Sequence, residues 1–222
     1  MCQRMLLRSF SSIACAVLLC LAAGGLSAQP QERGPFSAAD LVELSLLDST
    51  IHLDIRYATS GNFMKRPMYT EARAFLQRPA AEALVRVHRG LRRKGLGLLI
   101  FDAYRPWSVT KAFWDETPPV RRMFVADPRK GSKHNRGCAV DLSLFDLKTG
   151  REIVMTSPFD SFTARAAPGY KGGTSEQRGM RNLLRSAMER EGFRVDPGEW
   201  WHFNYRDWRK YPILDIPFEM LR

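Results

Sequence analysis

The alternating segment from Gly137 to Phe145 constrains the fold of this chain more than any other feature. On one side of an extended backbone its side chains are apolar, and on the other side they include a carboxylate. The first set comprises Cys138, Val140, Leu142 and Leu144, and the second comprises Ala139, Asp141 and Ser143. We therefore expect a strand that packs its apolar side against a core and turns Asp141 toward a cleft.

The rest of the chain mixes helices and strands without a regular βαβ alternation. Helical spacing predicts helices over 80–94, after Pro106 and over 174–191. Extended segments are predicted at 51–55, 96–101, 193–195 and 200–205, and a hairpin turn at 148–150 leads into 151–155. This order predicts a single α+β domain with a mostly antiparallel central sheet flanked by helices.

The N-terminus has the form of a secretory signal peptide. Arg4 and Arg8 precede an apolar run from Ile13 to Ala23, and small residues follow up to Ala28. The run is shorter than the roughly 20 apolar residues that a membrane-spanning helix needs. We expect residues 1–28 to be removed and residues 29–222 to form an exported domain, periplasmic or secreted, with no transmembrane segment.

Cysteine usage agrees with this division. Cys2, Cys15 and Cys20 fall in the predicted signal peptide, which leaves Cys138 alone in the mature chain. One cysteine forms no internal disulfide, so the mature fold must rest on its core. The place of Cys138 on an apolar strand side predicts a small buried hydrophobic side chain rather than a nucleophile.

The chain is strongly basic. Its 34 lysines and arginines against 23 acids give a formal charge of +11, and loss of Arg4 and Arg8 leaves +9. Such a charge favours anionic partners, and an anionic cell-wall polymer is a candidate for an exported protein. The basic residues are scattered along the chain, so we expect no nucleic-acid binding.

His134 and Asp141 are the first pair of residues that point to chemistry. Gly137 lies between them and can adopt a positive φ, which lets the loop turn His134 back toward the carboxylate. A hydrogen-bonded pair without a metal is the alternative for this segment taken alone.

His202 supplies the third member of a metal-binding set. In the run Gly198–Phe203, Trp201 and Phe203 would face the core and leave His202 on the other side. Two histidines and one aspartate leave a fourth position open, as a catalytic zinc site requires. Glu199 stands three residues before His202, so it can act on a water there without being a ligand.

Asp102 and Arg105 follow a buried strand, in the run Phe101-Asp102-Ala103-Tyr104-Arg105-Pro106. Arg105 is a candidate for stabilising the oxyanion of a tetrahedral intermediate, with Asp102 fixing its guanidinium. A structural ion pair that steadies the turn before Pro106 explains the same residues equally well.

Together these segments carry a resemblance to a known family. Ser-x-His-x6-Asp, Glu-x2-His and Asp-x-Tyr-Arg-Pro resemble the zinc D-alanyl-D-alanine dipeptidases of the vancomycin-resistance type, relatives of zinc D,D-carboxypeptidases and hedgehog-like domains. The resemblance runs from about Asp54 to about Phe218 and includes the Glu199–His202 run. It implies a hedgehog-like or D,D-peptidase-like fold and hydrolysis of D-Ala-D-Ala to D-alanine.

The resemblance also assigns roles, residue by residue. It implies Zn²⁺ on His134, Asp141 and His202, Glu199 as general base and proton shuttle, and Arg105 as oxyanion stabiliser. It implies a substrate-carboxylate contact at Ser132 and a carboxylate near the substrate ammonium at Asp160. The full set of predicted substrate-binding residues is Ser132, Asp160, Tyr57, Tyr69 and Asp102.

The sequence also allows two other functions. A peptidoglycan D,D- or L,D-carboxypeptidase would use the same metal apparatus, and its anionic substrate would suit the basic chain. A noncatalytic zinc module would need neither Glu199 nor Arg105. Resistance-type dipeptidases act in the cytoplasm, so an exported relative would turn over or scavenge cell-wall precursors instead.

Overall fold

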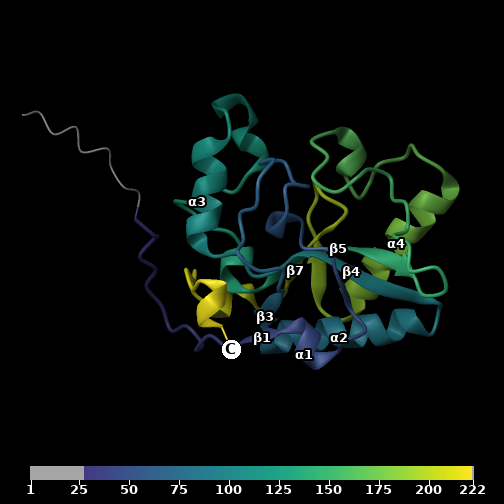
Figure 1. Cartoon of the computed structure of the whole chain (residues 1–222), viewed down its shortest axis with the longest axis horizontal. Helices are drawn as coiled ribbons and strands as arrows, with labels where there is room; N and C mark the ends of the chain where they lie inside the picture. Colours follow the sequence, from purple (N-terminus) through teal and green to yellow (C-terminus); the bar gives the residue numbers. More distant parts are fainter. Residues whose placement is uncertain (1–27, 222) are drawn as a thin grey trace, which may run out of the picture.

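The computed structural model describes residues 28–221 (Figure 1). Apart from Ala28, the predicted signal peptide lies outside the described residues. Among the helices of the described part, none has the length and apolar character required to cross a membrane.

A five-stranded sheet lies at the centre of the domain. In spatial order its strands are β2 (His52–Leu53), β4 (Leu96–Asp102), β5 (Ala139–Asp146), β7 (His202–Tyr205) and β6 (Phe193–Val195). β2 runs parallel to β4, whereas the other three pairs are antiparallel. The predicted α+β domain with a mostly antiparallel sheet is therefore confirmed. A separate antiparallel pair joins β1 (Leu41–Glu43) to β3 (Phe75–Gln77).

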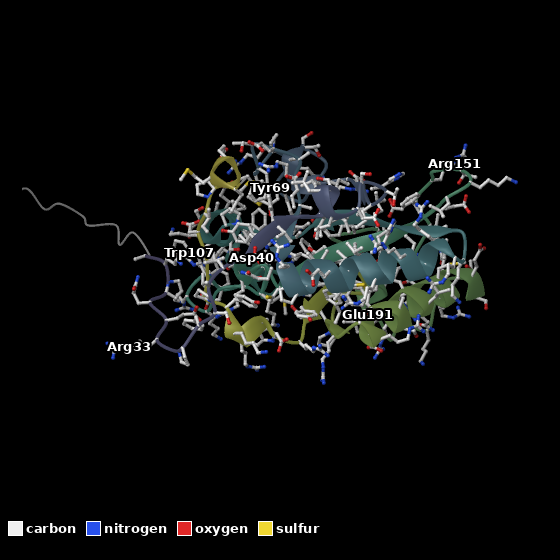
Figure 2. All side chains as sticks on the ribbon, turned by 90° about the horizontal axis from the view of Figure 1, so that it is seen from below. Arg33, Asp40, Tyr69, Trp107, Arg151 and Glu191 are labelled. Atoms are coloured by element: carbon white, nitrogen blue, oxygen red, sulfur yellow. The ribbon has the colours of Figure 1, made fainter. Side chains whose placement is uncertain are left out.

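Two long helices cover one face of this sheet. The α-helices of the described residues are α1 (Leu44–Leu47), α2 (Arg78–Arg92), α3 (Trp107–Glu116) and α4 (Ser175–Arg190). Figures 1 and 2 show α2 and α4 side by side beneath the sheet, while α3 and several loops lie on its opposite side. The predicted helices at 80–94, after Pro106 and at 174–191 thus form, with ends shifted by a few residues.

Local sequence explains where the two long helices begin. Pro79 stands in the first turn of α2, where its missing N–H costs no hydrogen bond. The side chain of Thr174 accepts a hydrogen bond from the backbone N–H of Gln177, whose own side chain accepts one from Thr174. This reciprocal cap fixes the start of α4.

The apolar side of β5 forms the middle of the core. Val140, Leu142 and Leu144 are fully buried in the core, as is Cys138, which matches its predicted role as a small hydrophobic residue. Burial raises the pKa of the Cys138 thiol to about 12, so the thiol stays protonated. The opposite side of β5, with Asp141, is covered by loops and is also buried.

The chain after β5 differs from the predicted hairpin. The turn at 148–150 forms, and Gly150 has a φ of +71°, but the return segment pairs only through an isolated bridge between Phe145 and Glu152. Val154 is 71% exposed and Met155 is buried, and residues 151–155 form no continuous strand. The chain instead leaves the sheet and forms the loops above the polar side of β5 (Figure 1).

Candidate active site

Strand register brings three acidic or imidazole side chains into one row. Asp141 of β5 pairs with His202 of β7 on one side and with Asp102 of β4 on the other. The register of β4 shifts between Ile100 and Asp102, a bulge that re-aims the end of the strand. As predicted, Trp201 and Phe203 are buried, and the side chain of His202 lies on the polar side with Asp141.

A short turn places His134 beside this row. The 3₁₀ helix η3 (His134–Arg136) ends at Gly137, which has a φ of +64° as the sequence suggested. Another residue at Gly137 would strain this left-handed backbone, and its Cβ would also meet the side chain of Leu41 at 2.4 Å. The backbone N–H of His134 donates to Oγ of Ser132 at 3.2 Å, which further fixes the turn.

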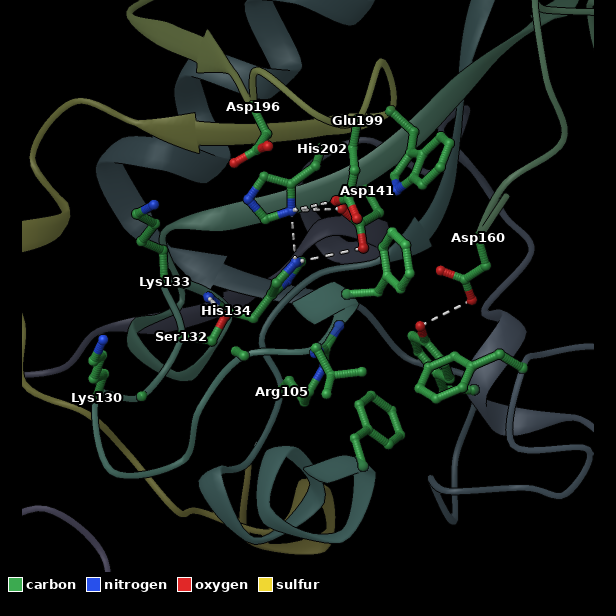
Figure 3. Close-up of a pocket in the computed structure, with 18 of the residues that line it drawn as sticks. Arg105, Lys130, Ser132, Lys133, His134, Asp141, Asp160, Asp196, Glu199 and His202 are labelled. Carbon is green, nitrogen blue, oxygen red and sulfur yellow. Dashed lines mark hydrogen bonds and ion pairs between the residues drawn. The ribbon is translucent and has the colours of Figure 1, made fainter. Parts of the chain in front are cut away.

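His134, Asp141 and His202 converge at one point (Figure 3). Nδ1 of His202 lies 2.9 Å from Oδ1 of Asp141 and 3.2 Å from Nε2 of His134, and that Nε2 lies 3.4 Å from Oδ2 of Asp141. One ligand atom from each residue lies within 4.8 Å of the others. The three residues that the sequence predicted as metal ligands are therefore brought together.

The second nitrogen of each imidazole has an acceptor. Nδ1 of His134 lies 2.6 Å from the carbonyl oxygen of Ala103, and Nε2 of His202 lies 2.9 Å from Oδ1 of Asn204. When each of these nitrogens donates its single hydrogen there, the lone pairs of the other two face the Asp141 carboxylate, which is the form that binds a metal. Three electron-rich atoms that face one another favour a cation between them, so the donor set fits a metal ion such as zinc.

The charges of these groups depend on one another. Burial opposes ionisation of Asp141, but His134 and His202 hold its pKa well below the ordinary value. Burial likewise opposes protonation of His202, yet the hydrogen bond to Asp141 raises the pKa of His202 to about 9. Positive charge is therefore favoured at the point where the three groups meet.

Glu199 stands next to this cluster. Its Oε2 lies 4.0 Å from Nδ1 of His202, and its side chain lines the same pocket. The chain turns just before it, because Asp196 Oδ1 accepts the Gly198 N–H at 2.9 Å. Burial raises the pKa of Glu199 to about 7, although the neighbouring His202 opposes this shift.

Arg105 is held from behind by Asp102. Its Nε and Nη2 donate to Oδ2 of Asp102 at 3.1 and 2.6 Å, and Tyr69 donates its hydroxyl to Oδ1 of Asp102 at 2.7 Å. Burial opposes the charge of Arg105, but Asp102 keeps its pKa well above the usual value. Arg105 lines the pocket, whereas Asp102 and Tyr69 are not among its lining residues. These two residues, predicted to bind substrate, thus lie behind Arg105 in this structure.

Asp160 and Tyr57 form another part of the wall. The Tyr57 hydroxyl donates to Oδ2 of Asp160 at 3.0 Å, and both residues line the pocket. Asp160 has a positive φ of +54°, a strained conformation for a residue other than glycine. Burial and the charge of Asp141 raise the pKa of Asp160 to about 8, so a cationic partner would be favourable here.

The metal-ligand candidates and their neighbours Glu199, Arg105 and Asp160 line one pocket of about 380 Å³. Of the predicted site residues, eight line it: Tyr57, Arg105, Ser132, His134, Asp141, Asp160, Glu199 and His202. A volume of this size is in the range of small-molecule sites.

Several supporting residues were missed by sequence reasoning. Asn204, two positions after His202 on the same side of β7, orients that imidazole, and period-two alternation would have found it. Asn135 donates to the carbonyl of Arg105 and to Oγ1 of Thr110, both at 2.8 Å, and so ties the η3 turn to α3. Glu32 binds Arg136, another pocket residue, from 104 positions away, and no local signal marks such a contact.

Comparisons with known proteins agree with the geometry. Residues 37–215 match the model of the M15 peptidase family, described as D-Ala-D-Ala dipeptidase. A D-alanyl-D-alanine dipeptidase of Escherichia coli is 31% identical over 179 residues, which cover 81% of this chain and 91% of that protein. A D-alanyl-D-alanine dipeptidase of Enterococcus faecium is 32% identical over 202 residues, which cover 79% of this chain and 98% of that protein.

Among solved structures, the LdcB LD-carboxypeptidase is similar at 18% identity and a TM-score of 0.47, covering 84% of this chain and 80% of that one. The family match spans most of the chain, and the relative from Enterococcus faecium is above 30% identity over almost its full length. The chain belongs to the D-Ala-D-Ala dipeptidase family of M15 peptidases.

Proposed function

We propose that this protein hydrolyses the free dipeptide D-Ala-D-Ala to D-alanine, with Zn²⁺ held by His134, Asp141 and His202. The observation that carries the proposal is the convergence of these three side chains beside Glu199 in one pocket. Family membership, and relatives with this activity in their names, support the same substrate.

Zinc suits this donor set for two reasons. Two imidazole nitrogens and a carboxylate are ordinary zinc ligands, and three protein ligands leave a position for the reaction. A zinc ion held there supplies Lewis-acid polarisation of the scissile carbonyl and lowers the pKa of water.

We assign the proton transfer to Glu199, which lines the pocket beside His202. As general base it accepts a proton from the attacking water while the water oxygen bonds to the carbonyl carbon. When the carbon–nitrogen bond breaks, Glu199 passes the proton to the leaving amine, so protons and atoms balance over the cycle.

In this proposal Arg105 stabilises the oxygen of the scissile carbonyl, which becomes negative when water attacks the carbonyl carbon. Its Nε and Nη2 donate to Asp102, which fixes the guanidinium where it lines the pocket. The faces of Tyr57 and Phe113 hold it at 5.3 and 4.8 Å. A buried, fixed cation costs little reorganisation at the moment of reaction.

Asp160 suits the ammonium end of a free dipeptide. It is a buried carboxyl group whose polar partner in the described chain is the Tyr57 hydroxyl, so a cation close to it would favour its ionised form. Ser132 lines the pocket as well, and its hydroxyl hydrogen is available because its oxygen accepts from His134.

We further propose that residues 1–28 are a signal peptide and that the enzyme acts outside the cytoplasm, in turnover or scavenging of cell-wall precursors. The basic Arg4 and Arg8 before the apolar run at 13–23 support export. N-terminal sequencing of the protein from fractionated cells tests this, and an intact Met1 in the cytosol would overturn it.

Kinetics on a substrate panel tests the catalytic proposal. We expect purified zinc-loaded enzyme to cleave free D-Ala-D-Ala faster than L,D- and D,L-dipeptides and faster than a pentapeptide stem or a muropeptide. Preferential release of the terminal residue from the stem would instead identify a peptidoglycan carboxypeptidase.

A further inference from the structure

We infer that Lys133, together with Lys130, forms a cationic end of the pocket that binds the C-terminal carboxylate of the substrate. This inference rests on the proposed dipeptidase function and adds to it the residues that select a free acid at that end. Both lysines line the pocket, beside Ser132.

The two lysines lie opposite Asp160 in the pocket. Figure 3 shows Lys130, Lys133 and Ser132 on one side of the converging ligands, and Asp160 on the other side. A free dipeptide carries opposite charges at its two ends, so a pocket with a carboxyl group at one end and ammonium groups at the other matches it in one orientation. That orientation places the scissile bond over His134, Asp141 and His202.

Neither lysine is neutralised by the protein. Among the described residues, Lys111 pairs with Asp115 and Lys210 with Asp207, whereas no carboxylate lies within 4.0 Å of Lys130 or Lys133. Lysines without a partner are common on surfaces, but these two share a pocket. Asp196 also lines this side, and its Oδ1 is engaged by the Gly198 N–H.

Contacts at Gly131, Ser132 and Lys133 fix the backbone that carries the two lysines. Gly131 has a φ of +67°, and a Cβ there would lie 2.3 Å from the side chain of Ile213, so the turn between the lysines is tightly enclosed. The Ser132 N–H donates to Oδ1 of Asn135 at 2.7 Å, and the Lys133 carbonyl accepts from Cys138 at 3.1 Å.

The side chain of Lys133 is restricted by burial and by the Trp208 ring. It is half-buried, and its Nζ lies 5.7 Å from the centre of the Trp208 ring, a cation–π distance. Trp208 itself lines the pocket. Lys133 directly precedes the ligand His134, so its position relative to the reaction centre is set by one peptide unit. Lys130 is exposed and more distant in sequence, so we assign it the smaller effect.

The test compares D-Ala-D-Ala with its C-terminal amide, D-Ala-D-alaninamide, which lacks the negative charge but keeps nearly the same shape. The enzymes are the mature wild type, Lys133→Gln, Lys130→Gln and Lys133→Arg. Lys148→Gln is the matched control, because Lys148 is an exposed lysine on the turn after β5. Values of kcat and KM are measured for both substrates.

We expect the wild type to prefer the free acid. Lys133→Gln should raise the KM for D-Ala-D-Ala by about three- to tenfold, leave kcat within about twofold, and reduce the preference for the acid by the same factor as the rise in KM. Lys133→Arg should retain most of the preference, Lys130→Gln should show a smaller loss, and Lys148→Gln should match the wild type.

An unchanged acid-to-amide preference in Lys133→Gln and in the Lys130→Gln, Lys133→Gln double variant would overturn the inference while leaving the dipeptidase activity standing. A wild type that cleaves neither substrate would overturn the proposed function, and this inference with it. Thermal unfolding of each variant separates loss of folding from loss of binding. If Lys133→Gln does not fold, Lys133→Arg and Lys130→Gln still decide, because an acid-to-amide preference in Lys130→Gln equal to that of the wild type would count against the cationic end.

Discussion

Asp141 and His202 are direct neighbours across the β5–β7 pairing, with Oδ1 of the first 2.9 Å from Nδ1 of the second. They are 61 positions apart in the chain, so strand pairing rather than a loop sets their distance. A register slip of one residue would turn one of the two side chains to the opposite face of the sheet. The metal site therefore depends on the same pairing that builds the core.

Loss of His202 should remove the metal. His202→Ala deletes one of the three ligand atoms and leaves Asp141 and His134 too few to hold zinc tightly, so both zinc content and D-Ala-D-Ala hydrolysis should be lost. Metal analysis of the purified variant measures the first, and an amine-release assay the second. His52→Ala is the matched control, because His52 is exposed and outside the pocket. Full zinc occupancy in His202→Ala would show that the ligand assignment is wrong.

Asp102 should matter mainly for stability. Its side chain is 1% exposed and balances the charge of Arg105, which is 10% exposed. Asp102→Asn keeps the shape but leaves that arginine buried without a counter-charge, at a cost of about 3–5 kcal/mol in the free energy of unfolding. Urea denaturation measures the change.

Glu116→Gln serves as the control for the Asp102 experiment. It removes a carboxylate that pairs with Arg66 on the surface, where the side chains are 43% and 51% exposed, and should cost no more than about 1 kcal/mol. Equal effects of the two substitutions would show that the Asp102–Arg105 pair does not depend on its burial.

The ligand set could be predicted because each residue stands in a local pattern. Alternation in Gly137–Phe145 places Asp141 on the polar side of β5, and the two large aromatic residues around His202 place that imidazole on the same side of β7. The glycine after η3 then accounts for the return of His134 toward them.

Residues that act at a distance could not be predicted in this way. Tyr69 reaches Asp102 across 33 positions, and Glu32 reaches Arg136 across 104. Such contacts depend on how whole segments pack, and side-chain type alone does not indicate them. The predicted return strand after Gly150 is reduced to the single bridge between Phe145 and Glu152. Whether a segment continues along its neighbour depends on the packing around it, which the local sequence pattern does not contain.

The buried His88 should make stability fall as the pH is lowered. Its Nδ1 accepts from the Leu98 N–H at 3.1 Å, its Nε2 lies 3.0 Å from Oγ1 of Thr50, and burial lowers its pKa from 6.5 to about 4. Asp48 opposes this shift, while Arg92, His52 and Arg89 add to it. The unfolded chain therefore binds more protons between these values, so the stabilisation is complete above pH 6.5 and is lost as the pH falls toward 4.

Thermal unfolding at pH 7.5 and pH 5.0 checks this dependence. His88→Gln removes the titrating group, so the variant should be less stable than the wild type at pH 7.5 but should lose less of its Tm on going to pH 5.0. The same fall in Tm for both proteins would show that other groups, not His88, cause the pH dependence.

Glu199→Gln should separate metal binding from catalysis. Glu199 lies 4.0 Å from a ligand nitrogen, yet three other residues already supply the ligand atoms. Glutamine keeps the shape and the hydrogen-bonding reach but accepts no proton at neutral pH. General acid–base catalysis contributes about 10²- to 10⁴-fold, so turnover of D-Ala-D-Ala should fall at least about a hundredfold. Zinc content and Tm should change little, because the swap is nearly isosteric and removes no core packing.

The control for this last experiment is Glu189→Gln, which changes an exposed glutamate on α4 that pairs with Arg185 outside the pocket and should leave kcat and KM unchanged. Zinc lost together with activity in Glu199→Gln would identify Glu199 as a ligand or as an essential support of one. Near-normal turnover would place the general base elsewhere. Asp160 would then be the next candidate, because it is the other pocket carboxyl group whose pKa burial raises toward neutrality.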